Sequence, residues 1–544
     1  MKTLTLTLAA GLAAALAARP VRADEGLWLF NAFPKDVVRK THGFTVTDAY
    51  LDHLRMSAVR FNNGGTGSFV SANGLLFTNH HVGSDCIAKL STPANDLMKK
   101  GFLARTPAEE RACPDLEVNV LTGIEDVTEK VKGAVKQGAS DAEANRARNA
   151  AIAEIEKACA GGVADRRCDV VTLFSGGLYH LYKYKKYTDI RLVMAPEFEI
   201  AFFGGDPENF TYPRYNLDIA FFRAYENGKP AKPLDHFKFA RSGVKEGDLV
   251  FVPGHPGTTG RLLTMSQLEF SGEVSYPLIH ARLESIIRAA KAYSARGAEE
   301  KRQAQDVLFG VENSFKAYTG FLRGLKDRAL MDQKRADEKK FREAAANNAS
   351  LGKVYDDLST AMSNLRAYYP EYALLETYAA TGNELLRIAR TVLRYAEETK
   401  KPDGERLKEF RSAALPSLEQ ELFSEAPVYP ALDEALLANY LEFVSARLGA
   451  SHPVVASLLE GRTAAAAAKA YVSASKLMDV AERKRLAKEP GALAASKDGM
   501  IEFARKLDVG ARAARKRYED EVESVVTRAA SEIARARFSL YGAA

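Results

Sequence analysis

The hydrophobic pattern of the chain changes character about halfway along. From Asp24 to about Phe270, short β-like runs alternate with Gly, Pro and Asn turn residues, a pattern typical of small antiparallel β-structures. From about Glu273 to Phe538, Ala, Leu, Glu, Lys and Arg dominate, and apolar residues recur at helical spacing. The sequence therefore predicts an α+β protein in which a β-barrel is joined to a large helical region.

The predicted strands of the first region are short and lie between turn residues. They are Leu116–Leu121, Val170–Phe174, Ile190–Met194, Ile200–Phe203, Leu217–Tyr225 and Asp248–Val252. A stretch rich in Ala, Glu and Arg, roughly Ser140–Ala160, predicts one helix inserted among them. The chain has no fixed-period repeat, so we do not expect a solenoid.

Composition excludes several classes of protein. The 544 residues are 46% hydrophobic and 27% charged, which is typical of globular domains, and this length suggests at least two of them. The formal charge of +6 is small for this length, and basic residues are interleaved with acidic ones. We therefore expect neither a nucleic-acid nor a membrane partner.

The first 23 residues have the pattern of a cleavable secretory signal. Lys2 provides the positive start, Leu4 to Ala18 the apolar stretch, and Val21-Arg22-Ala23 a small-x-small cleavage site. A membrane anchor needs about 20 apolar residues, more than this stretch contains. We expect a mature chain that begins at Asp24 and is periplasmic or secreted.

Export makes disulfides possible, and the chain has four cysteines. Cys159 and Cys168 flank a Gly-rich loop, which favours that pair together with Cys86–Cys113, although sequence alone leaves three pairings open. A zinc site needs closer clustering, such as Cys-x-x-Cys, which the chain lacks. We expect no metal.

Two histidines follow a predicted hairpin. Thr66–Ser71 and Leu75–Thr78 are short β-like runs joined by Ala72-Asn73-Gly74, and the second delivers His80 and His81 into a turn. An imidazole has an ordinary pKa near 6.5, so it can accept a proton from a nucleophile at neutral pH. The order Thr-Asn-His-His-Val resembles the way chymotrypsin-fold proteases present their general base, which assigns that role to His81 and a structural one to His80.

A carboxylate follows at the start of a later apolar run. Asp218 stands between a polar, proline-bearing loop and the run from Ile219 to Arg223. A carboxylate that accepts the Nδ1–H of histidine fixes its tautomer and stabilises the imidazolium formed during attack. An Asp at such a position is otherwise a turn cap. We predict that Asp218 orients His81.

Longer motifs resemble one family, the bacterial periplasmic serine exopeptidases typified by dipeptidyl-peptidases 7 and 11. The matching segments are Asp24–Trp28, Thr66–Ser71, Thr78–His81, Tyr182–Val193, Gly205–Arg214 and Pro253–Gly257. The chain departs from the family at Val82, where the family carries cysteine. This departure puts in doubt any disulfide built from that position, and Cys86 is the candidate to replace it.

The resemblance implies a chymotrypsin-like fold of two β-barrels with an inserted helical domain that caps the cleft. It divides the chain into a signal (1–23), a barrel domain (24–270), a helical cap (271–538) and a lead-in to a second barrel (539–544). It implies that Asn209, Phe210 and Asn313 hold the free amino end of a peptide; Phe210 replaces the family's Trp and lacks its N–H. It implies no cofactor, peptides as partners, and a homodimer.

The family's nucleophilic serine stands in a Gly-Asn-Ser-Gly-Ser-Pro loop, and this sequence contains no such loop. Ser175 and Ser271 lack the Gly-x-Ser-Gly context that forms a strained turn with oxyanion-hole amides. We therefore expect a truncated, inactive chain of a serine dipeptidyl-peptidase whose nucleophile lies beyond Ala544. One alternative is a non-catalytic peptide-binding protein. The other is an HtrA-like endopeptidase, against which the long helical region argues.

Overall fold

A computed structural model describes residues 27–257, 260, 262–347 and 350–542. The predicted signal segment lies outside these residues. The described residues fall into two compact units, one within residues 27–51 and the other within residues 52–542. In the first, the short helix α2 (Lys35–His42) ends at Gly43 in the left-handed conformation, which glycine adopts without steric cost.

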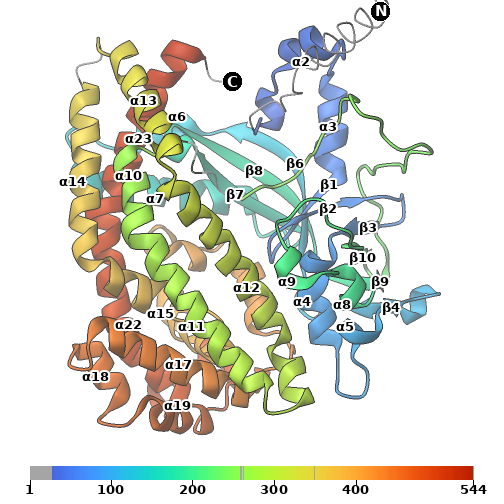
Figure 1. The fold of residues 1–544 in the computed structure, drawn as a ribbon, viewed down its shortest axis with the longest axis vertical. Helices are drawn as coiled ribbons and strands as arrows, with labels where there is room; N and C mark the ends of the chain where they lie inside the picture. The colour runs from blue at the N-terminus through green and yellow to red at the C-terminus, as the bar shows by residue number, and fades with distance from the viewer. Residues whose placement is uncertain (1–26, 258–259, 261, 348–349, 543–544) are drawn as a thin grey trace, which may run out of the picture. The chain divides into compact units, whose positions relative to one another are not determined.

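The second unit contains an antiparallel sheet, drawn in blue to green in Figure 1. Its described strands are β1 (Ala58–Phe61), β2 (Thr66–Phe69), β3 (Leu75–Thr78), β4 (Phe102–Leu103), β5 (Arg111–Ala112), β6 (Val118–Asp126), β7 (Arg166–Leu173), β8 (Leu178–Tyr187), β9 (Asp189–Ala195), β10 (Ala220–Glu226) and β11 (Lys229–Pro230). They follow the order β4-β9-β10-β3-β2-β1-β6-β8-β7, with β5 on β9 and β11 on β10.

The register of the central strands positions the candidate site. β3 lies between β2 and β10, and Thr78 at its end pairs with Ala220 at the start of β10. Because the strands are antiparallel, the residues after Thr78 run beside those before Ala220. Alternate side chains such as Phe69, Leu76 and Phe222 are fully buried and fix this register, since a slip by one residue would expose them.

Two predicted strands are wrong, and five described strands were not predicted: the long strand β8 and the short strands β1, β4, β5 and β11. Ile200–Phe203 contains the end of a one-turn helix, α8 (Phe198–Ala201), and Ile200 and Phe203 are largely exposed. Asp248–Val252 forms no strand among the described residues. The ten-residue strand β8 alternates tyrosine with lysine over much of its length, so it lacks the continuous apolar run by which the other strands were predicted.

The predicted inserted helix is α7 (Asp141–Ala160). Ser140 and Glu143 form a capping box at its start, and Gly161 ends it in the left-handed conformation.

The helical region extends from α10 to α23, as predicted, in green to red in Figure 1. Its α-helices are α10 (Met265–Phe270), α11 (Tyr276–Ser294), α12 (Ala298–Lys326), α13 (Arg328–Ala344), α14 (Ser350–Glu371), α15 (Glu384–Glu398), α16 (Leu415–Leu422), α17 (Pro430–Leu448), α18 (Pro453–Leu459), α19 (Ala464–Ser473), α20 (Val480–Lys488), α21 (Ala492–Ala495), α22 (Gly499–Tyr518) and α23 (Ser524–Tyr541). A core that includes Leu385, Val392, Tyr440 and Phe503 joins α15, α17 and α22.

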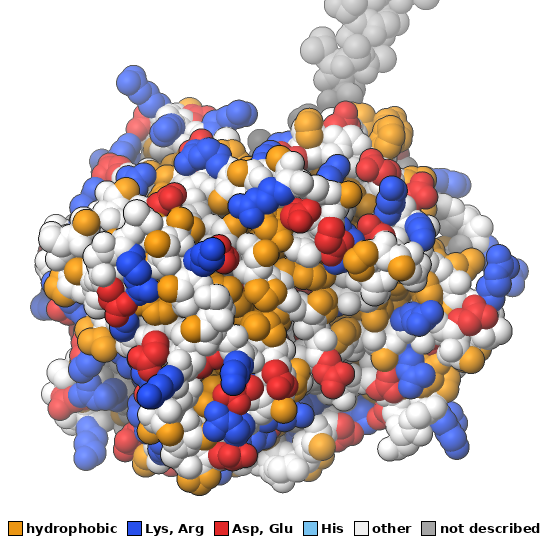
Figure 2. Space-filling view, turned by 90° about the horizontal axis from the view of Figure 1, so that it is seen from below, with side chains coloured by type: hydrophobic (Ala, Val, Ile, Leu, Met, Phe, Trp, Pro, Cys, Tyr) orange, Lys and Arg blue, Asp and Glu red, His pale blue; other side chains and the backbone are white. Residues whose placement is uncertain are grey.

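Charges of both signs cover the surface. Figure 2 shows Lys and Arg side chains interspersed with Asp and Glu on the face that it presents. Among the described helices, none has both the length and the apolar character that crossing a bilayer requires.

A turn at residues 253–257 packs on β2 and buries a histidine. The His255 N–H donates to Thr66 Oγ1 at 2.9 Å, and its ring Nε2 is buried without a partner. Burial, and secondarily the charge of Arg60, lowers the pKa of His255 to about 4.

An unfolded histidine titrates near pH 6.5, so the unfolded chain binds this proton first as pH falls. We expect the free energy of unfolding to be unaffected by this group above pH 6.5 and to lose about 3 kcal/mol between pH 6.5 and 4. Urea unfolding of the parent and His255→Phe chains across this range checks it. Equal pH slopes for the two chains would contradict the assignment.

Candidate active site

His81 stands where β3 passes into helix α4 (His80–Leu90). Its Nδ1 lies 2.6 Å from Asp218 Oδ2, and its backbone N–H donates to Asp218 Oδ1 at 3.0 Å. Asn79 Nδ2 also donates to Asp218 Oδ2, at 3.1 Å. The carboxylate thus lies at the N-terminus of α4 and accepts one of its backbone N–H groups, where the helix dipole favours negative charge.

The environment of Asp218 keeps it ionised. Partial burial by itself raises the pKa of the carboxyl, but the hydrogen bonds and charge of His81 outweigh burial and hold the pKa below its ordinary value. An ionised carboxylate has only acceptors, so it fixes the His81 proton on Nδ1 and leaves Nε2 as the acceptor. The His81 side chain is 51% exposed, which makes this nitrogen accessible.

His80 faces the interior instead. It is 2% exposed, its ring lies 6.3 Å from that of Phe198, and its Nε2 is buried without a partner. Burial lowers the pKa of His80, so the ring is neutral at pH 7. A buried neutral imidazole is a packing residue here.

One face of α12 lies along the sheet region beside this pair. Its contacting residues recur at helical spacing and are Arg302, Asp306, Phe309, Asn313 and Lys316. Arg302 donates to the Ser91 carbonyl at 3.4 Å, and the Phe309 ring packs edge-on against Phe202 at 4.8 Å. The α12 helix is therefore bound to both the α4 region and the loop before β10.

This contact brings the two predicted asparagines together. Asn209 Nδ2 donates to Asn313 Oδ1 at 3.0 Å. Phe210 has φ +60° and is 65% exposed, so its ring is available to a ligand. Asn209 and Asn313 are separated by 104 residues in sequence, and the resemblance had assigned both to a common site.

Sequence reasoning missed two cations that flank this loop. Arg214 donates to Asn209 Oδ1 at 3.2 Å, and Lys316 donates to the carbonyls of Asp206 and Pro207. Lys316 could have been found from its helical spacing to Asn313, since both lie on one face of α12. Arg214 gave no signal in the sequence beyond its place in the loop.

The four cysteines form the pairs Cys86–Cys113 and Cys159–Cys168, which is the pairing that the sequence favoured. Cys86 lies in α4, so the first bridge ties the helix behind His81 to the chain before β6.

Neither rejected serine contacts His81. Ser175 is in a turn whose neighbours pack on α23, and Ser271 donates to the Gln267 carbonyl in the helical region. Within the described part of the chain, no side chain hydrogen-bonds to His81 Nε2, and no group of three His, Cys, Asp or Glu residues could hold a metal.

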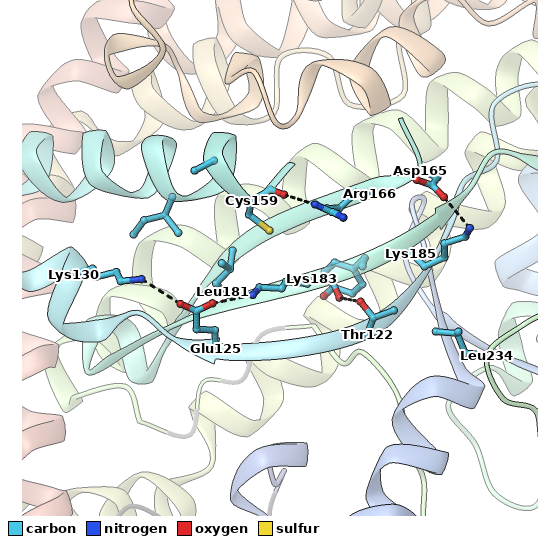
Figure 3. Close-up of a pocket in the computed structure, with 13 residues that line it drawn as sticks. Thr122, Glu125, Lys130, Cys159, Asp165, Arg166, Leu181, Lys183, Lys185 and Leu234 are labelled. Carbon is cyan, nitrogen blue, oxygen red and sulfur yellow. Dashed lines mark hydrogen bonds and ion pairs between the residues drawn. The ribbon is translucent and has the colours of Figure 1, made fainter. Parts of the chain in front are cut away.

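A cavity of about 780 Å³ lies between α7 and strands β6 to β8, away from the His81–Asp218 pair (Figure 3). Most of its charged groups pair with one another: Lys130 and Lys183 bind Glu125, and Lys185 binds Asp165, whereas Arg166 donates to the Cys159 carbonyl. Among the described residues, no histidine lines this cavity, so the His81–Asp218 pair is the better candidate site.

Known proteins resemble the chain over most of its length. Dipeptidyl-peptidase 7 of Porphyromonas endodontalis is 29% identical over 79% of this chain and 53% of the relative. The Asp/Glu-specific dipeptidyl-peptidase of Shewanella putrefaciens is 30% identical over 74% of this chain and 56% of the relative. The chain therefore spans about half the length of these relatives.

The fold is that of solved peptidase structures. The crystal structure of Porphyromonas endodontalis DPP11 in complex with the dipeptide Arg-Glu superposes with a TM-score of 0.75 at 23% identity, covering 96% of this chain and 78% of that one. The sequence profile of the family described as Peptidase S46 matches residues 23–544. This chain therefore belongs to the peptidase S46 family.

Proposed function

We propose that this chain is part of an exported serine dipeptidyl aminopeptidase, which releases dipeptides from the free amino end of peptides. It carries the general base His81 and the carboxylate of Asp218 that orients this base. The observation that carries the proposal is the 2.6 Å contact between His81 Nδ1 and Asp218 Oδ2, in a family whose relatives are dipeptidyl-peptidases. The nucleophile is a serine in the part of the relatives' length that these residues do not match.

The chemistry follows from the pair. His81 Nε2 accepts the proton of the serine hydroxyl as the oxygen attacks the peptide carbonyl, and Asp218 stabilises the imidazolium that forms. The imidazolium then gives its proton to the leaving amine, which leaves an acyl-enzyme. Water, deprotonated by the same nitrogen, releases the dipeptide.

The amide pair explains why cleavage would stop after two residues. An ammonium has three donors and no acceptor, and each amide oxygen of Asn209 and Asn313 accepts one bond here and has a second lone pair. An amine held there fixes the distance from the amino end to the scissile bond, and Phe210 adds an aromatic wall.

The finer architecture is part of the proposal. Residues 24–270 form a chymotrypsin-like barrel domain, and the helical residues 271–538 cap its cleft. The protein would be exported through its first 23 residues and would form a homodimer, which light scattering of the purified protein tests.

The deciding experiment uses the protein from the complete reading frame. We expect it to release a fluorophore from dipeptidyl substrates with free amino ends, and to leave the same substrates intact when the amino end is acetylated. The panel includes acidic and apolar second residues. Cleavage of both forms at equal rates would refute the exopeptidase assignment.

The same assay tests the second candidate, a non-catalytic peptide-binding protein that keeps the fold and the Asn209–Asn313 contact. That candidate predicts no cleavage by any form of the protein, together with retained binding of peptides that have free amino ends. The first candidate predicts no turnover by residues 24–544 alone and turnover by the complete protein.

A further inference from the structure

The loop that carries Asn209 is bound by cations from two directions. Arg214 donates to the carbonyls of Phe203 and Gly205 at 3.4 and 3.3 Å, and its guanidinium lies 4.6 Å from the centre of the Phe202 ring. Lys316 of α12 binds the carbonyls of Asp206 and Pro207. Four backbone carbonyls of one short loop are thus held by two side chains.

The orientation of both amides follows from Arg214. A guanidinium has only donors, so the atom of Asn209 that faces it must be Oδ1. The other end of that amide, Nδ2, then faces α12, and a donor there requires the oxygen of Asn313. The hydrogen bonds therefore run in one direction, from Arg214 through Asn209 to Asn313.

This direction determines what a ligand meets. With the amides as they stand, the oxygens of Asn209 and Asn313 each accept one hydrogen bond and each have one lone pair left for an ammonium. If Asn313 were reversed, its Nδ2 would face Asn209 Nδ2, two donors would meet, and the Asn313 oxygen would no longer lie beside Asn209.

We propose that Arg214 is the positioning residue of the amine site: it sets the orientation of the two amides and so presents both oxygens to the substrate's free amino end. The inference rests on the proposed function, because it assumes that the amides bind that amine. Arg214 itself acts through Asn209 and touches no substrate.

The test compares three substitutions in the complete protein. Arg214→Met keeps an unbranched chain over Phe202 and removes every donor. Arg214→Lys restores a group that can only donate, whereas Arg214→Gln restores a group that can donate or accept. The matched control is Arg191→Met, outside the amine site. Arg191 pairs with Asp189, and its guanidinium lies 3.8 Å from the centre of the Tyr225 ring.

We expect Arg214→Met to raise KM for free-amine substrates about tenfold, with kcat within about threefold of the parent, because Asn209 loses the charge-assisted hydrogen bond that orients its amide toward the substrate amine. Lysine should recover most of the loss and glutamine should not. Arg191→Met should leave KM unchanged. An unchanged KM in Arg214→Met, or equal rescue by glutamine and lysine, would overturn the proposal.

Crystal structures of the parent and Arg214→Met proteins test the hydrogen bonds from Arg214 through Asn209 to Asn313 without any activity assay. We expect the 3.0 Å contact between the two amides in the parent and its loss in the variant. An unchanged contact in the variant would overturn the role of Arg214. Failure of the parent to distinguish free from acetylated substrates would instead refute the proposed function, with the crystallographic result unaffected.

Discussion

Asp218→Asn in the complete protein is expected to lower kcat by about 10⁴-fold and to leave KM within a few-fold of the parent. The reason lies in the fixed donors around this carboxylate. The backbone N–H of His81 donates to Oδ1, and a backbone donor cannot be reversed. The new amide must keep its oxygen there, so its NH₂ faces His81 Nδ1.

An NH₂ group facing Nδ1 requires that nitrogen to be an acceptor, which moves the imidazole proton to Nε2. The nitrogen that should accept the serine proton is then already protonated. Steady-state kinetics on a free-amine dipeptidyl substrate measures the loss, and the thermal midpoint shows whether the variant is folded.

The chain offers a matched control in a second histidine–aspartate pair. His53 Nδ1 lies 2.8 Å from Asp235 Oδ2, with partial exposure of both side chains, outside the candidate site. Asp235→Asn makes the same chemical change, and we expect kcat to stay within about twofold of the parent. Similar losses in the two variants would mean that general destabilisation, and not a tautomer, explains the effect of Asp218→Asn.

The sequence predicted this pair because its signals are local. His81 follows a short strand and Asp218 precedes another, and β3 and β10 are neighbours whose register the buried Leu76 and Phe222 enforce. The helix α7 was predicted for the same reason, because a stretch rich in Ala, Glu and Arg favours helix without a distant partner.

The misses were features that depend on tertiary contacts. Ile200 belongs to an apolar stretch, yet that stretch turns into α8, whose Phe198 packs on Phe309 of the helical region. Nothing near Arg214 in sequence indicates that it orients Asn209 toward a residue 104 positions further on. Contacts between distant segments fix such side chains, and a single sequence does not show them.

Glu376→Gln is expected to lower the free energy of unfolding by about 3 kcal/mol, because it removes the carboxylate from a buried group of ion pairs. Glu376 is 9% exposed and accepts hydrogen bonds from Arg390 and Arg394, each at 2.6 Å. Burial alone raises the pKa of this carboxyl, but the arginines outweigh burial and lower it to about 2. The ion pairs are therefore complete at neutral pH and weaken only as pH falls from about 4.5 toward 2.

The loss of stability in Glu376→Gln comes mainly from Arg390, which is left without a counter-charge. Without the carboxylate, Arg394 still binds Asp508 at 2.7 Å, whereas Arg390 has only the backbone carbonyl of Glu376 besides a neutral amide. A buried guanidinium without a counter-charge is strongly unfavourable. Urea unfolding of residues 24–544, followed by circular dichroism, measures the loss of free energy.

Glu273→Gln is the matched control, because Glu273 pairs with Arg366 while both side chains are exposed, at 61% and 43%. An exposed pair contributes less than about 1 kcal/mol, so this variant should unfold close to the parent. Since η5 (Tyr372–Thr377), α15 and α22 meet at Glu376, its loss should loosen the same core that supports α17. Equal effects of the two substitutions would show that the buried cluster is not what stabilises this region.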